Sequence, residues 1–326
     1  MSELPGYEDV LSAGRQLEGH AVRTPLLESS VLNERLGGRV LIKPEVLQRT
    51  GSFKFRGAYN RLSRMTAAER KTGVVAFSSG NHAQGVALAA HLLGIPAVIV
   101  IPTDAPQVKV AGVLRYGAEI ISYDRETGDR EAIASELVED NGATLVPSFD
   151  DPFIIAGQGT CGLEIAQDCA AQGITPDLLL CGAGGGGLIA GTGLAVLHHF
   201  PKTEIWAVEP DGFDDHARSL EAGKRLSNNR QTGSIQDAIM TPAPGKLTFP
   251  LNRDQLAGAV SVTDDETLDA MAFAFSHLKL VGEPGGVSSL AALLAGKVAL
   301  DGRTAIAILT GGNVDPAIFK RALERA

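Results

Sequence analysis

Short apolar runs rich in β-forming residues alternate with longer stretches of helical character, and this alternation restricts the fold more than any other feature of the chain. Seven such runs predict strands: Val74–Ser79, Ala97–Pro102, Glu119–Tyr123, Thr144–Ser148, Asp177–Cys181, Glu204–Glu209 and Thr304–Thr310. Several are apolar along their whole length, which is typical of parallel strands buried on both faces. Segments between them predict helices over Asn81–Leu93, Gly159–Cys169 and Leu188–His198. This succession predicts a doubly wound α/β architecture.

Composition limits the class of partner. The chain has 326 residues, long enough for one large or two ordinary domains, and its formal net charge of −9 repels nucleic acid and anionic membranes at long range. No apolar run has the length of a bilayer span, and the N-terminus lacks the pattern of a secretory signal. We therefore expect a cytoplasmic protein without nucleic-acid or membrane partners. Its three cysteines, Cys161, Cys169 and Cys181, are expected to be reduced thiols.

Three of the predicted strands end in glycine-containing turns, Ser78–His82, Gly182–Leu188 and Thr310–Asn313. In an open α/β sheet the carboxyl ends of the strands meet at the edge where ligands bind. A glycine turn that leads into a helix presents free backbone N–H groups and the positive end of the helix dipole, which suits a carboxylate or a phosphate. For the first turn, an ordinary connection capped by Ser and Asn explains the residues equally well.

The second turn contains four consecutive glycines, Gly184–Gly187. Their entropic cost is explained if the backbone must approach a phosphate closely. No Lys-Ser/Thr pair follows, so the turn is not a nucleotide P-loop. However, Gly182, Gly184 and Gly187 match G-x-G-x-x-G, and Glu209 ends a later strand near the position of a ribose-binding acid. An NAD-dependent oxidoreductase is therefore a competing interpretation, with the difficulty that these glycines come late in the chain.

One lysine has an unusual sequence context. Most lysines are solvated surface charges. Lys54 is instead flanked by Phe53 and Phe55. If these rings enclose the amine, desolvation lowers its pKa and makes it a nucleophile toward an aldehyde.

These pieces together resemble one known family. Eight stretches carry the resemblance: Arg23–Leu26 (RTPL), Thr50–Ala58 (TGSFKFRGA), Ser78–Gly85 (SSGNHAQG), Ala156–Thr160 (AGQGT), Gly184–Leu188 (GGGGL), Val208–Pro210 (VEP), Glu283–Gly286 (EPGG) and Thr310–Asn313 (TGGN). In their order they resemble the fold-type II (tryptophan synthase β-like) enzymes that use pyridoxal 5′-phosphate (PLP), and within them the serine/threonine dehydratase and serine racemase family, which includes L-threo-3-hydroxyaspartate dehydratases. The resemblance implies a homodimer with two doubly wound open-sheet domains per chain. Residues 1–72 and 150–326 would form a large PLP-binding domain, and residues 73–149 a small mobile domain that binds the substrate carboxylate.

The resemblance also implies how PLP is held. Lys54 would form the Schiff base, Phe53 would pack on the ring, and Asn81 would bond the ring hydroxyl oxygen. Other cofactor-binding positions are the phosphate-binding backbone of Gly184, Gly185, Gly186, Gly187 and Leu188, then Glu283, and Thr310 at the pyridine nitrogen. Because a neutral hydroxyl does not strongly favour a protonated pyridine nitrogen, Thr310 favours β-elimination over transamination.

The implied reaction converts a β-hydroxy amino acid to a keto acid and ammonia. Freed Lys54 would remove the α-proton as general base, and the β-hydroxyl would then leave. The substrate carboxylate would rest on Ser78, Ser79, Asn81 and His82, largely through backbone N–H groups. Ser79 would face Lys54 across the substrate, so racemisation of the serine racemase type is the alternative activity. A PLP-binding protein without catalysis and a sulfur-transferring relative such as a cysteine synthase are further alternatives, although the lysine motif of the latter differs.

Arg130 bears on the choice among L-serine, L-threonine and 3-hydroxyaspartate. It occupies a position where serine racemase-like members carry Arg, and a cation there could hold a second carboxylate bidentately. That interpretation favours 3-hydroxyaspartate. A surface Arg130 paired with Asp129 or Glu131 explains the residue equally well.

A divalent-cation site is also implied. Residues 209–215 resemble the cation loop of the family, in which Glu209 and Asp215 would supply carboxylates and Phe213 its backbone carbonyl. Oxygen ligands suit Mg²⁺, Mn²⁺ or Ca²⁺. The alternative is a solvated acidic loop that caps a helix.

Overall fold

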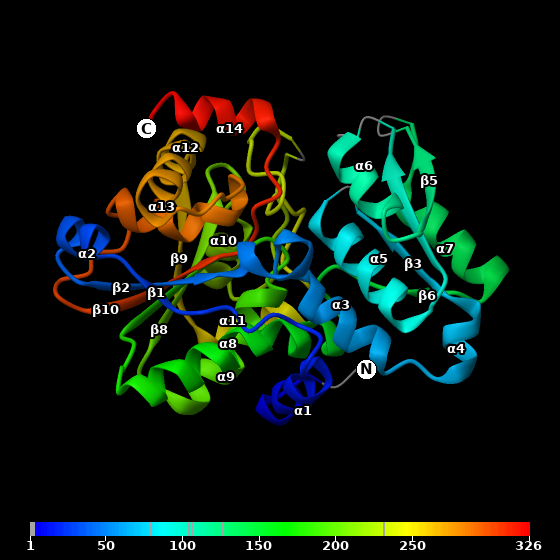
Figure 1. Ribbon diagram of the computed structural model, residues 1–326, viewed down its shortest axis with the longest axis horizontal. Helices are drawn as coiled ribbons and strands as arrows, with labels where there is room; N and C mark the ends of the chain where they lie inside the picture. Colours follow the sequence, from blue (N-terminus) through cyan, green and yellow to red (C-terminus); the bar gives the residue numbers. More distant parts are fainter. Residues whose placement is uncertain (1–3, 79, 104, 106, 125–126, 231) are drawn as a thin grey trace.

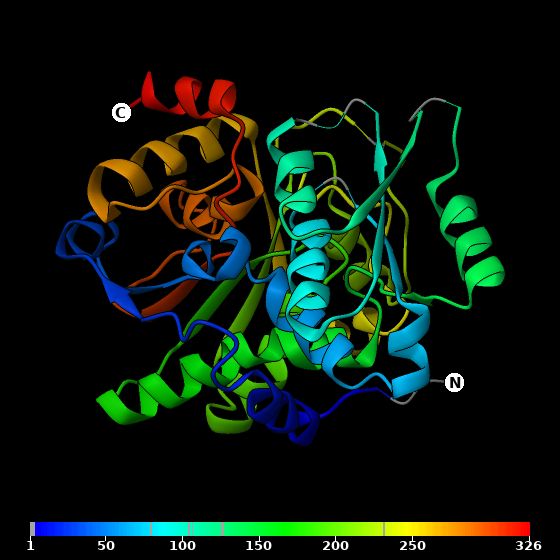
Figure 2. The ribbon, with the colours of Figure 1, turned by 45° about the vertical axis from the view of Figure 1, so that its right-hand side comes forward.

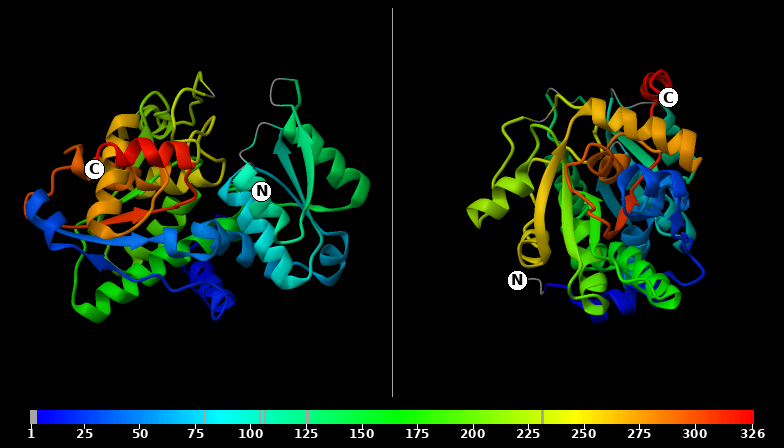
Figure 3. Two further views of the ribbon diagram at one scale, coloured as in Figure 1. Left: turned by 45° about the horizontal axis from the view of Figure 1, so that its top comes forward. Right: turned by 90° about the vertical axis from the view of Figure 1, so that its left-hand side faces the viewer.

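The computed structural model describes residues 4–326 apart from positions 79, 104, 106, 125, 126 and 231, with the backbone alone at 107–109 and 130. It has two lobes, which Figure 3 separates most clearly in its left-hand view. The larger lobe is built on a six-stranded sheet and the smaller on a four-stranded sheet (Figure 1). Helix α3 (Lys54–Ser63) leads from the first lobe to the second and packs on α8 (Pro152–Gln172), which leads back.

The six-stranded sheet has the order β1-β2-β10-β7-β8-β9. Its strands are β1 (Leu27–Glu28), β2 (Arg39–Pro44), β7 (Leu178–Gly182), β8 (Glu204–Pro210), β9 (Leu256–Val262) and β10 (Thr304–Leu309). All neighbours are parallel except β1 and β2. Successive residues point to opposite faces: Leu180 packs with α12 (Asp264–Phe273) and α13 (Ser288–Leu294), whereas Leu179 packs with α8 and α9 (Gly187–His199). The sheet is thus buried on both faces.

The four-stranded sheet is wholly parallel and has the order β5-β4-β3-β6. Its strands are β3 (Val74–Phe77), β4 (Ala97–Pro102), β5 (Glu119–Tyr123) and β6 (Thr144–Leu145). Helices α3 and α5 (Asn81–Leu93) cover one face, and α7 (Arg130–Asn141) covers the other. Figure 2 shows α5, α6 (Gln107–Leu114) and α7 around this sheet.

The remaining elements surround these layers. They are α1 (Tyr7–Leu17), α2 (Ser30–Leu36), α4 (Ala67–Thr72), α10 (Asp215–Ala222), α11 (Thr248–Gln255), α14 (Pro316–Leu323), the 3-10 turns η1 (Glu45–Leu47), η2 (Arg49–Gly51) and η4 (Gly285–Val287), and the π-helical η3 (Ala274–Leu278). Within the described part of the chain, no helix is both long and apolar enough to cross a bilayer. All three cysteines are buried and free.

The predicted α/β class is confirmed, and most predicted elements lie where they were expected. β4, β5 and α5 match their predicted bounds. β6 is shorter than predicted because Pro147 has no N–H to continue the ladder beyond Val146. β2 was missed because its apolar run contains Lys43, which is fully buried in an ion pair with Glu164.

Sheet order explains where a ligand site can form. In the small sheet β4 and β5 follow β3 on one side, whereas β6 lies on its other side. In the large sheet β8 and β9 lie on one side of β7, and β10 lies on the other. A parallel sheet opens a crevice at the carboxyl end of the strands where its order reverses. The three glycine turns predicted from the sequence follow β3, β7 and β10, the strands that border these two crevices.

Candidate active site

Lys54 is placed by the end of β10. The backbone N–H of Phe53 donates to the Thr310 carbonyl at 3.1 Å, and the N–H of Gly312 donates to the Gly51 carbonyl at 2.9 Å. Lys54 then opens α3. This pairing brings residues more than 250 positions apart in sequence to one edge of the sheet, so the lysine motif and the TGGN motif form a single structure.

The Lys54 amine lies between a backbone carbonyl and an aromatic ring. Its Nζ donates to the Ser148 carbonyl at 2.9 Å and lies 5.1 Å from the centroid of the Phe53 ring. Burial lowers the pKa of Lys54 to about 8, and the charge of Glu283 opposes this only in part. A substantial fraction of neutral amine near physiological pH is what attack on an aldehyde requires.

Asn81, the first residue of α5, is held by two neighbours. Its Nδ2 donates to Glu283 Oε1 at 2.5 Å, and its Oδ1 accepts from Asn313 Nδ2 at 2.7 Å. A Cβ on Gly311 would overlap the Glu283 carboxylate, so the contact between Asn81 and Glu283 needs a glycine at position 311. The predicted cofactor residues Asn81 and Glu283 are therefore in contact, and Asn313 is a partner that residue-by-residue reasoning did not name, although it belongs to the TGGN motif.

The glycine-rich loop leads directly into α9. Gly186, at φ +88°, precedes the helix, and no described side chain caps the first N–H groups of α9. The Gly185 carbonyl points elsewhere, because it accepts from the Thr248 hydroxyl at 2.5 Å and from the Gly245 N–H at 3.1 Å. A Cβ on Gly185 would overlap the Phe149 ring. An uncapped helix start behind a loop without side chains fits a phosphate.

The loop after β3 carries the predicted carboxylate site. The Ser78 hydroxyl accepts from the Gly80 N–H at 3.2 Å, and the buried His82 ring lies 2.8 Å, Nε2 to oxygen, from the Val146 carbonyl. Burial and the Lys54 charge lower the pKa of His82 to about 3, so its imidazole is neutral. Ser79 lies outside the described residues. Arg130 is the first residue of α7, and its side chain lies outside them as well.

The predicted cation loop folds into a buried carboxylate cluster. One ligand atom each of Glu209, Asp215 and His216 lie within 4.8 Å of one another, and Phe213 is buried nearby in sequence. Burial and the charge of Asp215 raise the pKa of Glu209 to about 8, and burial raises the pKa of Asp215 to about 6. Oδ2 of Asp215 has no hydrogen-bond partner among the described residues. An unpartnered buried carboxylate oxygen beside a second carboxylate fits a hard divalent cation.

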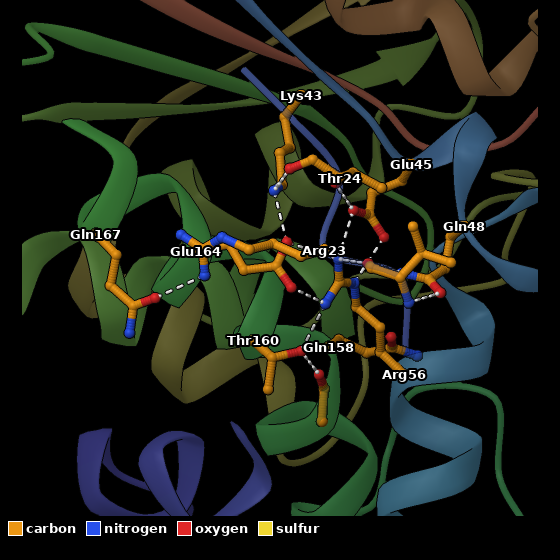
Figure 4. Close-up of polar contacts among 12 residues, drawn as sticks. Arg23, Thr24, Lys43, Glu45, Gln48, Arg56, Gln158, Thr160, Glu164 and Gln167 are labelled. Carbon is orange, nitrogen blue, oxygen red and sulfur yellow. Dashed lines mark hydrogen bonds and ion pairs between the residues drawn. The ribbon is translucent and has the colours of Figure 1, made fainter. Parts of the chain in front are cut away.

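A buried ionic cluster, which the sequence analysis did not find, fixes the first turn of α3 (Figure 4). Arg56 donates through Nε to Glu45 Oε2 and through Nη1 to Glu164 Oε1, both at 2.7 Å. Lys43 Nζ donates to Glu164 Oε2 at 2.6 Å. Two cations thus face two carboxylates between β2, α3 and α8. The only sequence signal was charge inside otherwise apolar segments.

A half-buried lysine of lowered pKa, an uncapped helix start and two further glycine turns together fit a phosphorylated aldehyde. A family model described as "Pyridoxal-phosphate dependent enzyme" matches residues 17–311, and the chain belongs to this family.

Known relatives define the branch of the family. The chain is 46% identical over 313 residues to the L-threo-3-hydroxyaspartate ammonia-lyase of Pseudomonas sp., which covers 96% of this chain and 97% of that protein. It is 41% identical over 312 residues to the serine racemase of Schizosaccharomyces pombe, covering 96% and 95%. The solved threonine deaminase of T.th. superposes with a TM-score of 0.90 at 42% identity, covering 95% of this chain and 99% of that one.

At the level of enzyme class, these relatives decide between the interpretations that the sequence left open. The cofactor is PLP, the fold is that of the fold-type II enzymes, and the chain is a PLP-dependent carbon–oxygen lyase. The NAD-dependent oxidoreductase is therefore ruled out. The G-x-G-x-x-G match arose because a phosphate group of either cofactor needs the same glycine-lined helix start.

Proposed function

We propose that this lyase acts on L-threo-3-hydroxyaspartate and converts it to ammonia and a four-carbon keto diacid, the water lost in β-elimination being taken up again when the resulting imine hydrolyses. Support comes from relatives of that name at 46% and 41% identity, which span nearly all of this chain. Arg130 at the start of α7 would supply the cation for the second carboxylate. L-threonine and L-serine are the second candidates, because relatives named as threonine dehydratases are 39% identical.

The single observation that carries the reaction type is the state of Lys54. PLP, when bound, supplies the aldehyde that captures the substrate amine and withdraws electrons from its α-carbon. Lys54 would hold the cofactor at rest and, once free, take the α-proton on Nζ. A pKa of about 8 suits a base that must accept and return a proton near neutral pH.

The other described residues would hold the cofactor. Phe53 would pack on the ring, Asn81 would bond the ring hydroxyl oxygen, and Thr310 would face the ring nitrogen without protonating it. The phosphate would be bound by backbone N–H groups at the start of α9, from Gly184, Gly185, Gly186, Gly187 and Leu188. Glu283 would act through its hydrogen bond to Asn81.

Substrate binding would involve the small lobe. The start of α5, with Ser78, Ser79, Asn81 and His82, would hold the α-carboxylate through backbone N–H groups. We also propose that residues 73–149 move as one body and close this loop over the substrate. Ser79, opposite Lys54, would permit racemisation as a secondary activity.

Three further features belong to the proposal. Glu209, Asp215 and the Phe213 carbonyl would bind Mg²⁺, Mn²⁺ or Ca²⁺. The enzyme would act as a homodimer. It would work in the cytoplasm, where buried free thiols remain reduced.

The test is an assay of ammonia and keto-acid release by the PLP-loaded protein. L-threo- and erythro-3-hydroxyaspartate, L-threonine and L-serine are offered side by side. We expect L-threo-3-hydroxyaspartate to give the highest kcat/KM and Lys54→Ala to abolish turnover. Arg130→Ala should lower kcat/KM for hydroxyaspartate at least tenfold but change that for serine little, because only the former has a second carboxylate.

Arg115→Ala is the matched control, since Arg115 is an exposed arginine of the same lobe. It should leave all four activities unchanged. If threonine or serine is preferred and Arg130→Ala has no selective effect, the hydroxyaspartate assignment is wrong and the second candidates take its place.

A further inference from the structure

One short segment touches three parts of the proposed site in succession. Residues 146–150, here called the crossing segment, run from the end of β6 in the small lobe to the start of α8 in the large lobe. The Val146 N–H donates to the Val75 carbonyl at 2.9 Å, which attaches the segment to β3. Two residues later, the Ser148 carbonyl accepts the hydrogen bond from Lys54 Nζ. The acceptor that orients the lysine amine is therefore part of this segment.

The far end of the crossing segment is attached to the glycine-rich loop. The Phe149 ring occupies the space beside Gly185, and its Cβ would lie 3.0 Å from a Cβ on Gly187. Asp150 accepts from the N–H groups of Lys246 and Leu247 at 2.8 and 2.7 Å. These two residues precede Thr248, which donates to the Gly185 carbonyl. The segment thus ends against the structure that would hold the phosphate.

One side chain attaches the small-lobe end of the crossing segment to the loop after β3 that would bind the substrate carboxylate, here called the carboxylate loop. His82 lies in the first turn of α5, its side chain is buried, and its Nε2 donates to the Val146 carbonyl at 2.8 Å. Its Nδ1 is also buried and has no hydrogen-bond partner in the described part of the chain. The bond to Val146 is therefore the polar contact that determines the orientation of the ring.

We propose that His82 is a positioning residue that couples the carboxylate loop to Lys54 through the crossing segment. A carboxylate that binds at the start of α5 draws in the first turn, and His82 transmits this displacement to Val146. The Ser148 carbonyl moves with it and orients the freed Lys54 amine toward the α-carbon. The inference rests on the proposed function, because it assumes that the start of α5 binds the substrate carboxylate.

Two substitutions separate this role from ordinary packing. His82→Gln keeps an N–H donor with comparable reach, whereas His82→Leu keeps bulk and removes the donor. Leu88→Ala serves as the control, since Leu88 is a core residue of the same helix and its truncation loosens the packing of the lobe while keeping the His82 side chain.

The experiment is hydrogen–deuterium exchange on the PLP-loaded protein with and without malonate, which carries two carboxylates and no amine and so undergoes no covalent step. In the wild type, malonate should slow exchange at the start of α5 and also in the crossing segment. His82→Leu should keep the first effect and lose the second, and His82→Gln should restore it. Leu88→Ala should retain both effects, with faster exchange throughout the small lobe.

Kinetics give a second readout on the same proteins. Per PLP-loaded site, His82→Leu should lower kcat roughly tenfold and leave KM within about twofold, because the backbone N–H groups still bind the carboxylate while Lys54 is misoriented. Leu88→Ala should leave kcat per loaded site unchanged. If His82→Leu retains malonate protection in both regions and a normal kcat, the coupling role is refuted.

The two proposals fail in distinguishable ways. Malonate protection of both regions without turnover of any hydroxy amino acid would refute the proposed substrate class and support the coupling. Normal turnover with protection confined to α5 in the wild type would refute the coupling alone.

Discussion

At the scale of single residues, the lowered pKa of Lys54 has a direct consequence for cofactor loading. Only the neutral amine attacks an aldehyde, so the rate at which PLP-free protein takes up PLP should rise with pH and level off above a midpoint of about 8. A solvated lysine would give a midpoint near 10.4. The measurement is the initial rate of appearance of bound-PLP absorbance between pH 6 and 10. A midpoint near 10 would show that the amine is hydrated, and Lys54→Ala, which should show no uptake, is the control.

The glycine-rich loop makes a second prediction at the residue scale. Gly185→Ala places a methyl group into the Phe149 ring, so the loop or the ring must shift, at a cost of about 1–3 kcal/mol. PLP affinity, measured by fluorescence titration of the PLP-free protein, should fall about tenfold or more. Adding Phe149→Ala should restore part of it. Gly6→Ala, where nothing lies within 4 Å, is the control and should bind PLP normally.

Residues of the candidate site could be predicted from the sequence where a side chain would carry the role, and not where the backbone does. Lys54, Asn81, Glu283 and Thr310 lie in motifs that end strands or open helices, and the sheet order brings such positions together. The acceptor of the Lys54 amine is a backbone carbonyl, at Ser148, and any residue type supplies one. Its position follows from the path of the chain between the lobes, which no local pattern records.

At the scale of elements, the buried ionic cluster holds α3 against β2 and α8. Arg56→Leu leaves Glu45 and Glu164 without their main cation, and we expect unfolding free energy to fall by about 3–5 kcal/mol. Urea unfolding by circular dichroism would measure this. Arg253→Leu is the control, because its ion pair with Asp254 is exposed, and its cost should be within about 0.5 kcal/mol. Equal costs would mean that the cluster contributes no more than surface charge.

The same cluster determines one part of the pH dependence of stability. Burial alone would raise the pKa of Glu45, but the charge and hydrogen bonds of Arg56, together with the Lys43 charge and the Thr24 hydrogen bond, leave that pKa below its ordinary value. A carboxyl group whose folded pKa is depressed stabilises the fold above its unfolded pKa, near 4.3. This contribution is lost as pH falls from there through the lower folded value. Between about pH 5 and pH 3, which brackets the ordinary carboxyl pKa, the free energy of unfolding of the wild type should therefore fall by more than that of Arg56→Leu.

Element boundaries were predictable where hydrophobic pattern alone decided them and not where tertiary contacts did. β4 and α5 have clean patterns and ends, and both were predicted correctly. β2 carries Arg39 and Lys43, and the buried Lys43 is tolerable because it pairs with Glu164 on α8, more than 100 residues away, and donates to the Thr24 carbonyl. β9 was missed for a related reason, since it is an edge strand whose residues are mostly half-buried.

At the scale of the whole molecule, α3 leads from the large lobe to the small one, and the crossing segment leads back into α8. Lys54 opens α3, and the Ser148 carbonyl of the crossing segment accepts its hydrogen bond. Alternation of strands and helices predicted a doubly wound α/β architecture, and the family resemblance implied two open-sheet domains, but the strand orders that open their crevices arise from the return of β6 to β3 and of β10 to β7. The family resemblance added an expectation that pattern alone could not give, namely that residues beside both crevices act at one site.

The carboxylate cluster of Glu209 and Asp215 lies next in sequence to a contact with the glycine-rich loop, and it yields the last prediction. His216 follows Asp215 directly, and its Nε2 would lie 2.8 Å from a Cβ on Gly186 of the glycine-rich loop. A cation that joins Glu209 to Asp215 removes their mutual repulsion in the folded state only, so it should stabilise the protein by about 2.7 kcal/mol at a hundred times its Kd. Differential scanning fluorimetry with Mg²⁺, Mn²⁺ or Ca²⁺ against EDTA should show a raised Tm. Asp215→Asn should abolish that rise, whereas Asp254→Asn, an exposed carboxylate elsewhere, should leave it intact. An equal rise in both variants would mean that the cations act through general ionic strength and that the cluster binds none of them.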